Sequence, residues 1–376
     1  MINPGRFQPP SRQLVVYGEA IETALPRVLR DFWAMQTVSI TNTSLSGNDG
    51  LEQRVADSLG DTLINRLTGI RRNTPRQDVM RVTEALRSKG VDSIVTIGGG
   101  SVVEAAKAAR ISLTNNIRNV LDMDRLKHVT TAASPRPYLV SIPTTLSGAE
   151  YTQFAGVTDE RSGAKDAFYH QDLAPDAVIL DPSATIDTPR KLWLSSGIRA
   201  LDHAIETFCT DAPTPYSDAT SLYAARVLVR WLSASGRDED DLEARLACQV
   251  ASWMAIQGAT IGVSHGLSHR LGRVLTEVTG LEHGIASCVL LPHAIRESAR
   301  LTRERQQALA MAMGRPGEDL ADIVTALVAE LGLPSSLSQA GVGNDQIAQV
   351  RKRAQDDPPA VPAGRLRLDA ILSAAA

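Results

Sequence analysis

Residues 92–113, DSIVTIGGGSVVEAAKAARISL, decide how the first half of this 376-residue chain folds. The apolar run over 93–97 predicts a buried strand, three glycines follow it, and residues 102–113 have a helical pattern. A buried strand that passes through a glycine turn into a helix is the first part of a βαβ unit. This stretch therefore predicts a parallel sheet with helices packed against it.

The segments around this stretch repeat the alternation of strand and helix. Strand patterns and helical patterns alternate over the ranges 12–18, 20–33, 37–45, 74–90 and 137–148. Such alternation predicts an α/β domain with a mostly parallel sheet, which we place at residues 1–183.

The second half of the chain has a different character. Helical periodicity covers 188–209, 218–236, 240–275 and 283–301, and no convincing strand follows. Aspartates and prolines interrupt the pattern at ILDPSATIDTP, residues 179–189. We therefore expect an all-helical second domain over residues 184–376.

Charge and composition exclude several classes of protein. The net charge is −3, so electrostatics favour neither nucleic acid nor an anionic membrane as a partner. The three cysteines, Cys209, Cys248 and Cys288, are far apart and odd in number, as is typical of reduced thiols. The N-terminal residues lack a signal-peptide core, and no apolar run approaches membrane-spanning length. We expect a soluble, cytoplasmic protein.

Two loops carry the chemistry expected at a phosphate site. Gly98, Gly99, Gly100 and Ser101 close a strand and open a helix, where backbone N–H groups and the helix dipole favour an anion. Their spacing is neither that of a Rossmann motif nor that of a P-loop, and a tight turn without a ligand is the alternative. A second loop follows the next predicted strand with Thr144, Thr145 and Ser147 at its start. Two such loops on adjacent βα units favour a nucleotide at the end of the sheet.

Histidines in the second half suggest a metal clamp. His265, His269 and Arg273 have the i, i+4, i+8 spacing of one helical stripe, while His203 lies on an earlier helix and His283 begins the next one. The set His203, His269 and His283 is a candidate group of metal ligands, although hydrogen-bonded structural histidines are the alternative for each one. Arg199 lies four residues before His203, where an anionic ligand would complete an open cation site.

The order of these motifs resembles a known family. The motifs that carry this resemblance are GGGS at 98–101, IPTTLSGAEYT at 142–152, APDAVILDP at 174–182, SGIRALDHAIE at 196–206, and H-x13-H-G from 269 followed by VLLPH at 289–293. The chain resembles the iron-containing (group III) alcohol dehydrogenases and, within them, most closely the maleylacetate reductases. The resemblance implies an N-terminal NAD(P)-binding α/β domain, a helical C-terminal domain with a dehydroquinate synthase-like architecture, catalysis in the cleft between them, and a homodimer.

The resemblance also assigns roles to individual residues. The pyrophosphate loop would be Gly98, Gly99, Gly100 and Ser101, and further cofactor contacts would come from Thr144, Thr145, Ser147 and Lys165. Metal ligands (Fe or Zn) would be His203, His269 and His283. Three positions depart from the family pattern: Arg199 replaces an acidic or amide residue, Arg273 replaces a second histidine, and Asn42 replaces the acid that often holds the adenosine ribose. Asn42 is compatible with both NAD and NADP.

The arginine departures suggest a changed site. At ~4 Å and an effective dielectric of ~20, one unpaired guanidinium would cost a bound dication about 8 kcal/mol, so we expect the metal to be weakly held or lost. Arg199 and Arg273 would then bind an anionic substrate or stabilise an oxyanion, with His203, His269 or His283 as the proton donor. In the alternative, Arg199 forms a salt bridge on its own helix, towards Asp202 or Glu206.

Three functions compete at this point. The first is an NAD(P)H-dependent reductase of a small anionic keto or enone substrate, similar to maleylacetate reductase. The second is a non-redox lyase or cyclase on a dehydroquinate synthase-like scaffold. The third is a relative that binds the cofactor without turnover.

Overall fold

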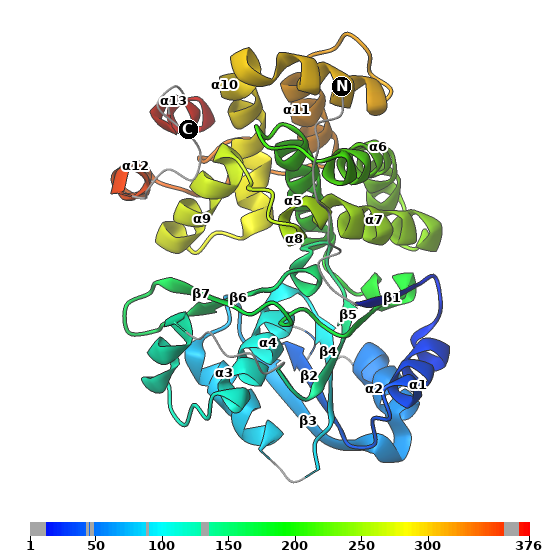
Figure 1. Ribbon diagram of the computed structural model, residues 1–376. Coiled ribbons are helices and arrows are strands. Elements are labelled where there is room, and N and C mark those ends of the chain that lie inside the picture. The colour runs from blue at the N-terminus through cyan, green and yellow to red at the C-terminus, as the bar shows by residue number, and fades with distance from the viewer. Residues whose placement is uncertain (1–12, 43–44, 46–48, 88–89, 129–134, 357–367) are drawn as a thin grey trace. The chain divides into compact units, whose positions relative to one another are not determined.

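The computed structural model describes residues 13–42, 45, 49–87, 90–128, 135–356 and 368–376. The chain forms two compact units, and the change from one to the other lies between Asp187 and Thr188. The first unit is α/β and the second is helical, which confirms the predicted fold class (Figure 1).

The first unit contains a six-stranded sheet in which all neighbours are parallel, in the order β1-β8-β5-β4-β2-β3. Its strands are β1 (Leu14–Tyr17), β2 (Thr37–Asn42), β3 (Leu63–Ile70), β4 (Ser93–Gly98), β5 (Tyr138–Pro143) and β8 (Ala177–Leu180). The helices of this unit are α1 (Ile21–Asp31), α2 (Asp49–Leu59), α3 (Arg76–Leu86) and α4 (Gly100–Thr114).

Alternating side chains of the central strands build two separate cores. Val38, Ile40 and Ile94 pack with α3 and α4, whereas Val95 and Ile97 pack with α1 and α2. Figure 1 shows these two helix pairs flanking the strands. Because both faces of the sheet are covered, the central strands β2, β4 and β5 are buried along almost their whole length, as is typical of a parallel sheet.

The sequence analysis did not predict four strands, β3, β6, β7 and β8. The edge strand β3 has the polar sequence LINRLTGI and is largely half-buried or exposed. The strands β6 (Phe154–Thr158) and β7 (Lys165–Tyr169) form a separate antiparallel hairpin with one exposed face. The strands β3, β6 and β7 lack the continuous apolar run that marks a buried strand, whereas β8 has such a run, AVIL, but it is only four residues long.

The second unit is helical throughout its described residues, 188–356 and 368–376. Its helices are α5 (Arg190–Phe208), α6 (Pro215–Arg237), α7 (Leu242–Ala255), α8 (Gln257–Thr260), α9 (Leu267–Thr279), α10 (His283–Ala312), α11 (Leu320–Glu330), α12 (Asn344–Asp356) and α13 (Leu368–Ala375). Helix α5 is buried along most of its length and packs against α6, α7, α9 and α10. This burial explains why α5 can carry functional side chains into the interior of the unit.

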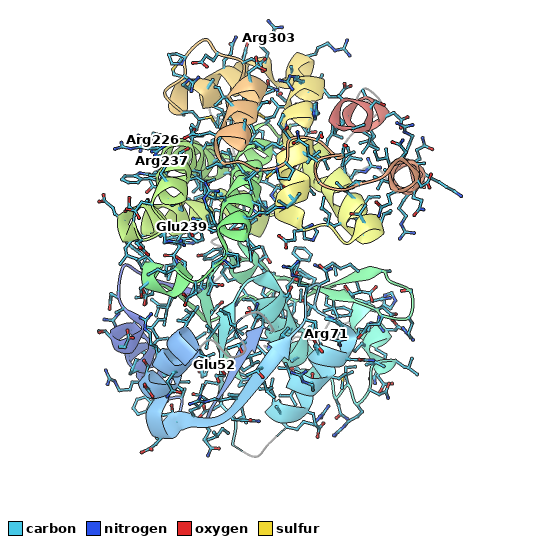
Figure 2. The ribbon with its side chains drawn as sticks, turned by 180° about the vertical axis from the view of Figure 1, so that it is seen from behind. Glu52, Arg71, Arg226, Arg237, Glu239 and Arg303 are labelled. Carbon is cyan, nitrogen blue, oxygen red and sulfur yellow. The ribbon has the colours of Figure 1, made fainter. Side chains whose placement is uncertain are left out.

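Charged side chains cover the outer faces of both units. Arg226, Arg237 and Arg303 on the helical unit are exposed, and Glu52 and Arg71 extend from the α/β unit (Figure 2). Among the described helices, none combines the length and the apolar composition that a membrane crossing requires.

Candidate active site

The two predicted phosphate loops meet at one edge of the sheet. Strand register pairs Thr41 of β2 with Ile97 of β4, and Gly98 of β4 with Pro143 of β5. The backbone N–H of Thr144 donates to the Gly98 carbonyl oxygen at 3.0 Å. The C-terminal ends of β2, β4 and β5 are therefore adjacent, and we call this edge, with the residues Asn42, Gly98, Gly99, Gly100, Ser101, Thr144, Thr145 and Ser147, the phosphate edge.

The three glycines of the phosphate edge are in close contact with neighbouring side chains. Gly98 has φ +142°, and a Cβ placed on it would lie 2.7 Å from Asn42 Oδ1. Thr145 Oγ1 lies 3.3 Å from the corresponding position on Gly99, and Ser147 Oγ lies 3.2 Å from that on Gly100. The small residues thus let the three loops come together at the first turn of α4, and a helix N-terminus favours an anion.

Ser101 and Lys165 have partners within this unit. Ser101 Oγ accepts the Asn73 backbone N–H at 3.2 Å, which ties the loop after β3 to the start of α4. Lys165 Nζ lies 3.4 Å from Glu104 Oε2, and Glu104 Oε1 accepts the Gly156 N–H at 3.0 Å. Glu104 therefore brings the β6–β7 hairpin, including Lys165, to the first turns of α4.

Lys107 organises the second loop and was missed in the sequence. This fully buried lysine donates from Nζ to the carbonyl oxygens of Ala149, Thr152 and Phe154 at 2.5, 2.6 and 2.8 Å. Burial lowers its pKa to about 7, while Glu104 and Glu150 oppose that shift. The signal was present in the sequence, because a lysine interrupts an otherwise apolar, Ala-rich helix face.

In the helical unit, α5 and the segment that opens α9 bring three histidines together. The ring centroids of His203 and His265 are 5.1 Å apart, those of His203 and His269 are 4.8 Å apart, and those of His265 and His269 are 3.9 Å apart. One ring nitrogen from each lies within 4.8 Å of the others. We call His203, His265 and His269 the imidazole cluster.

The imidazole cluster fits a divalent cation. His203 Nδ1, His265 Nε2 and His269 Nε2 are buried and have no hydrogen-bond partner among the described residues. Burial, together with the neighbouring His269 and Arg199, lowers the pKa of His203 and of His265 well below the usual range. Neutral imidazoles with unsatisfied buried nitrogens are the ligand type that Fe²⁺ and Zn²⁺ prefer, and leaving them unsatisfied is costly.

Two buried carboxylates lie beside His269 Nδ1, the ring nitrogen opposite the unsatisfied Nε2. His269 Nδ1 lies 2.6 Å from Glu206 Oε2 and 3.4 Å from Asp202 Oδ1. Burial and Arg199 lower the pKa of His269, but Asp202 and Glu206 outweigh them and raise it. Burial opposes ionisation of Asp202, yet His269, Arg199 and a hydrogen bond from Ser287 outweigh it and lower the pKa of Asp202. Anionic groups therefore lie directly beside the imidazole cluster.

Arg199 forms a salt bridge within its own helix, which was the alternative to its predicted role in binding an anion. Its Nη1 lies 3.5 Å from Asp202 Oδ2 and donates to Ser287 Oγ of α10 at 3.2 Å. Ser287 Oγ and Ser268 Oγ in turn donate to Asp202 Oδ2 at 2.6 and 2.8 Å. Arg199 is thus compensated by Asp202, and the assumption of an unpaired positive charge beside the histidines does not hold.

His283 and Arg273 lie outside the imidazole cluster. His283 begins α10, half-buried, with Nδ1 3.4 Å from Thr276 Oγ1. Arg273 is exposed on α9. The predicted helical stripe was wrong for His265, because α9 begins at Leu267 and His265 precedes it. The H-x3-H spacing of His265 and His269 nevertheless indicates a possible pair of metal ligands. The sequence analysis did not include His265 among the metal ligands.

Comparisons with known proteins agree with these two regions. The family model described as iron-containing alcohol dehydrogenase matches residues 12–182, and the model of the C-terminal part of the Fe-containing alcohol dehydrogenase family matches residues 193–363. The chain is 31% identical over 287 residues to the probable alcohol dehydrogenase EutG of Escherichia coli (strain K12), covering 74% of this chain and 71% of that protein. It is 29% identical over 366 residues to dehydrogenase ALT3 of Alternaria alternata, covering 87% of this chain and 94% of that protein.

A solved structure shares the fold. The crystal structure of maleylacetate reductase from Rhizobium sp. strain MTP-10005 superposes with a TM-score of 0.81 at 22% identity, covering 96% of this chain and 94% of the other. At this identity the match supports the architecture alone.

Proposed function

The chain belongs to the iron-containing alcohol dehydrogenase family, and we propose that it is an NAD(P)H-dependent reductase of a small keto or enone substrate that bears a carboxylate. The phosphate edge binds the dinucleotide, and the imidazole cluster holds a divalent cation. The observation that carries this proposal is a group of three histidines whose ring nitrogens lie within 4.8 Å of one another, each with one buried ring nitrogen that lacks a hydrogen-bond partner among the described residues.

The phosphate edge supplies what a pyrophosphate requires. Backbone N–H groups at the start of α4 would face the phosphate oxygens, and the hydroxyls of Thr145 and Ser147 lie beside the same glycines. Asn42 at the end of β2 carries no charge, so it does not repel the 2′-phosphate of NADP. Both dinucleotides are accordingly accepted in this proposal.

The imidazole cluster binds the cation through His203, His265 and His269. A divalent cation held there supplies Lewis-acid polarisation of the substrate carbonyl oxygen. The local charges favour it, because one guanidinium, Arg199, stands against two carboxylates, Asp202 and Glu206. At ~4 Å and an effective dielectric of ~20, each carboxylate stabilises the bound cation by about 4 kcal/mol per unit of cation charge. This stabilisation offsets the repulsion from Arg199, so Arg199 alone does not exclude the metal.

The substrate carboxylate is assigned to Arg273. This residue is exposed and lies one helical turn beyond His269 on α9, so the cation ligand and the guanidinium share one helix. Arg199 is engaged with Asp202 and Ser287, and its role becomes that of balancing the buried carboxylates. His283, half-buried at the start of α10, is the candidate proton donor.

Cofactor oxidation tests the proposal. Metal-depleted protein is reconstituted with Fe²⁺ or Zn²⁺ and assayed for oxidation of NADH and NADPH with a panel of small keto acids and enones that includes maleylacetate. The expected result is metal-dependent oxidation with at least one carboxylate-bearing member. Cofactor binding by fluorescence without oxidation across the panel would contradict it and favour a relative that only binds cofactor. The homodimer implied by the resemblance stays a prediction, which light scattering checks.

A further inference from the structure

The carboxylate of Glu206 receives an unusual set of donors. Glu206 lies on α5, yet its Oε2 accepts the backbone N–H groups of Gly266 at 3.0 Å and His269 at 3.2 Å, and its Oε1 accepts that of Ser268 at 2.6 Å. The ring of His269 adds a fourth contact, with Nδ1 2.6 Å from Oε2. One side chain therefore satisfies the first amides of α9 and one ring nitrogen of the imidazole cluster.

We infer that Glu206 is a positioning residue that caps α9 from a different helix and holds the His269 ring with its proton on Nδ1. A carboxylate oxygen only accepts, so Nδ1 carries the proton in the neutral ring and Nε2 carries the lone pair. His269 Nε2 is the nitrogen left buried without a partner among the described residues. The inference rests on the proposed function for what the lone pair binds, whereas the ring orientation is independent of it.

The start of α9 leaves space for the Glu206 carboxylate. Helices α6, α7 and α11 have their own N-cap side chains, Thr214, Asp241 and Asp319, but the N-cap residue of α9 is Gly266, which has no side chain to cap it. A Cβ on Gly266 would lie 2.8 Å from Glu206 Oε1 and 3.2 Å from its Cδ. Gly266 therefore leaves room that a capping serine or aspartate would fill.

Two variants test whether the Glu206 carboxylate sets the tautomer of the His269 ring. Glu206→Gln keeps the size but removes the charge and one acceptor, and Gly266→Ala displaces the carboxylate without changing any polar group. Long-range ¹H–¹⁵N spectra of the metal-free protein, recorded in alkaline buffer where the rings are neutral, report the His269 tautomer. Competition titration with Co²⁺ reports metal affinity. We expect an Nδ1–H ring in the wild type, a shift towards Nε2–H in both variants, and a loss of Co²⁺ affinity of about 10- to 100-fold.

A cap elsewhere in the same unit provides the control. Asp319 accepts the N–H groups of Ala321 and Asp322 at 2.9 and 3.2 Å at the start of α11. Asp319→Ala should lower Tm like any lost cap but leave the His269 tautomer and Co²⁺ affinity unchanged.

The outcomes distinguish the inference from the proposed function. An Nε2–H ring in the wild type, or wild-type tautomer and Co²⁺ affinity in both variants, would overturn the positioning role. If Glu206→Gln does not fold, Gly266→Ala decides alone. If the wild type binds no Co²⁺, the metal part of the proposed function fails, while the tautomer measurement still decides the role of Glu206.

Discussion

The phosphate edge and the imidazole cluster are built on different physical principles. At the phosphate edge the main chain is the functional group, and Gly98, Gly99 and Gly100 serve by having no side chain to block it. In the imidazole cluster the side chains are the functional groups, and one of them, His269, is in contact with the buried carboxylates of Glu206 and Asp202. The first region should therefore be sensitive to added volume, and the second to changed charge or lost ligands.

Removing a member of the imidazole cluster should have the largest effect. His265→Ala deletes one of three converging imidazoles, so Co²⁺ affinity should fall about 1000-fold, or about 4 kcal/mol. NADH affinity should stay unchanged because the phosphate edge lies in the other unit. The matched control is His283→Ala, which should keep Co²⁺ affinity because His283 lies outside the cluster. The opposite ranking of the two variants would restore His283 as the ligand.

Glu150, a buried carboxylate without the donors of Glu206, should make the free energy of unfolding depend on pH. Glu150 lies in the loop after β5, and burial raises its pKa to about 7 from the usual 4.5. The folded protein then binds this proton more tightly than the unfolded chain, so stability falls as pH rises from about 4.5 to about 7, by about 3 kcal/mol. In Glu150→Gln this component should vanish from the pH dependence of the unfolding free energy. Parallel profiles for variant and wild type would refute the shift.

Added volume should damage the phosphate edge selectively. Gly98→Val places carbon atoms against Asn42 Oδ1 in a backbone conformation with φ +142°, so NADH affinity should fall about 100-fold, or about 2.7 kcal/mol, in a fluorescence titration. Gly163→Val is the control, because Gly163 also has positive φ (+72°) but no neighbour within 4 Å of a Cβ. It should bind NADH normally. Equal losses in both variants would show that backbone strain, and not the close contact, is responsible.

A charge placed at the phosphate edge should have the smallest effect. Asn42→Asp keeps the shape of the side chain and adds a negative charge at the end of β2, so NADPH affinity should fall about tenfold relative to NADH, or about 1.4 kcal/mol. The ratio of the two dissociation constants measures it directly. An unchanged ratio would place the adenosine ribose away from Asn42.

The sequence predicted the phosphate edge more completely than the imidazole cluster. Local patterns located Gly98 and Thr145 at the ends of strands, and parallel pairing then brought them together without further information. The cluster depends on how α5 packs against the segment before α9. The sequence could not show that α9 begins only after Gly266, because a carboxylate from another helix supplies its cap. It also could not show that Arg199 would pair with Asp202, since several partners lie within reach on one helix.

The coordination shell of a bound metal distinguishes a metal-binding imidazole cluster from a pocket in which Arg199 has replaced the metal. X-ray absorption fine structure is measured at the Zn edge on protein loaded with one equivalent of Zn²⁺. We predict a shell with three imidazole nitrogens at about 2.0–2.1 Å from the zinc. A shell of oxygen ligands with one imidazole or none would contradict it, and would favour a pocket in which Arg199 has replaced the metal.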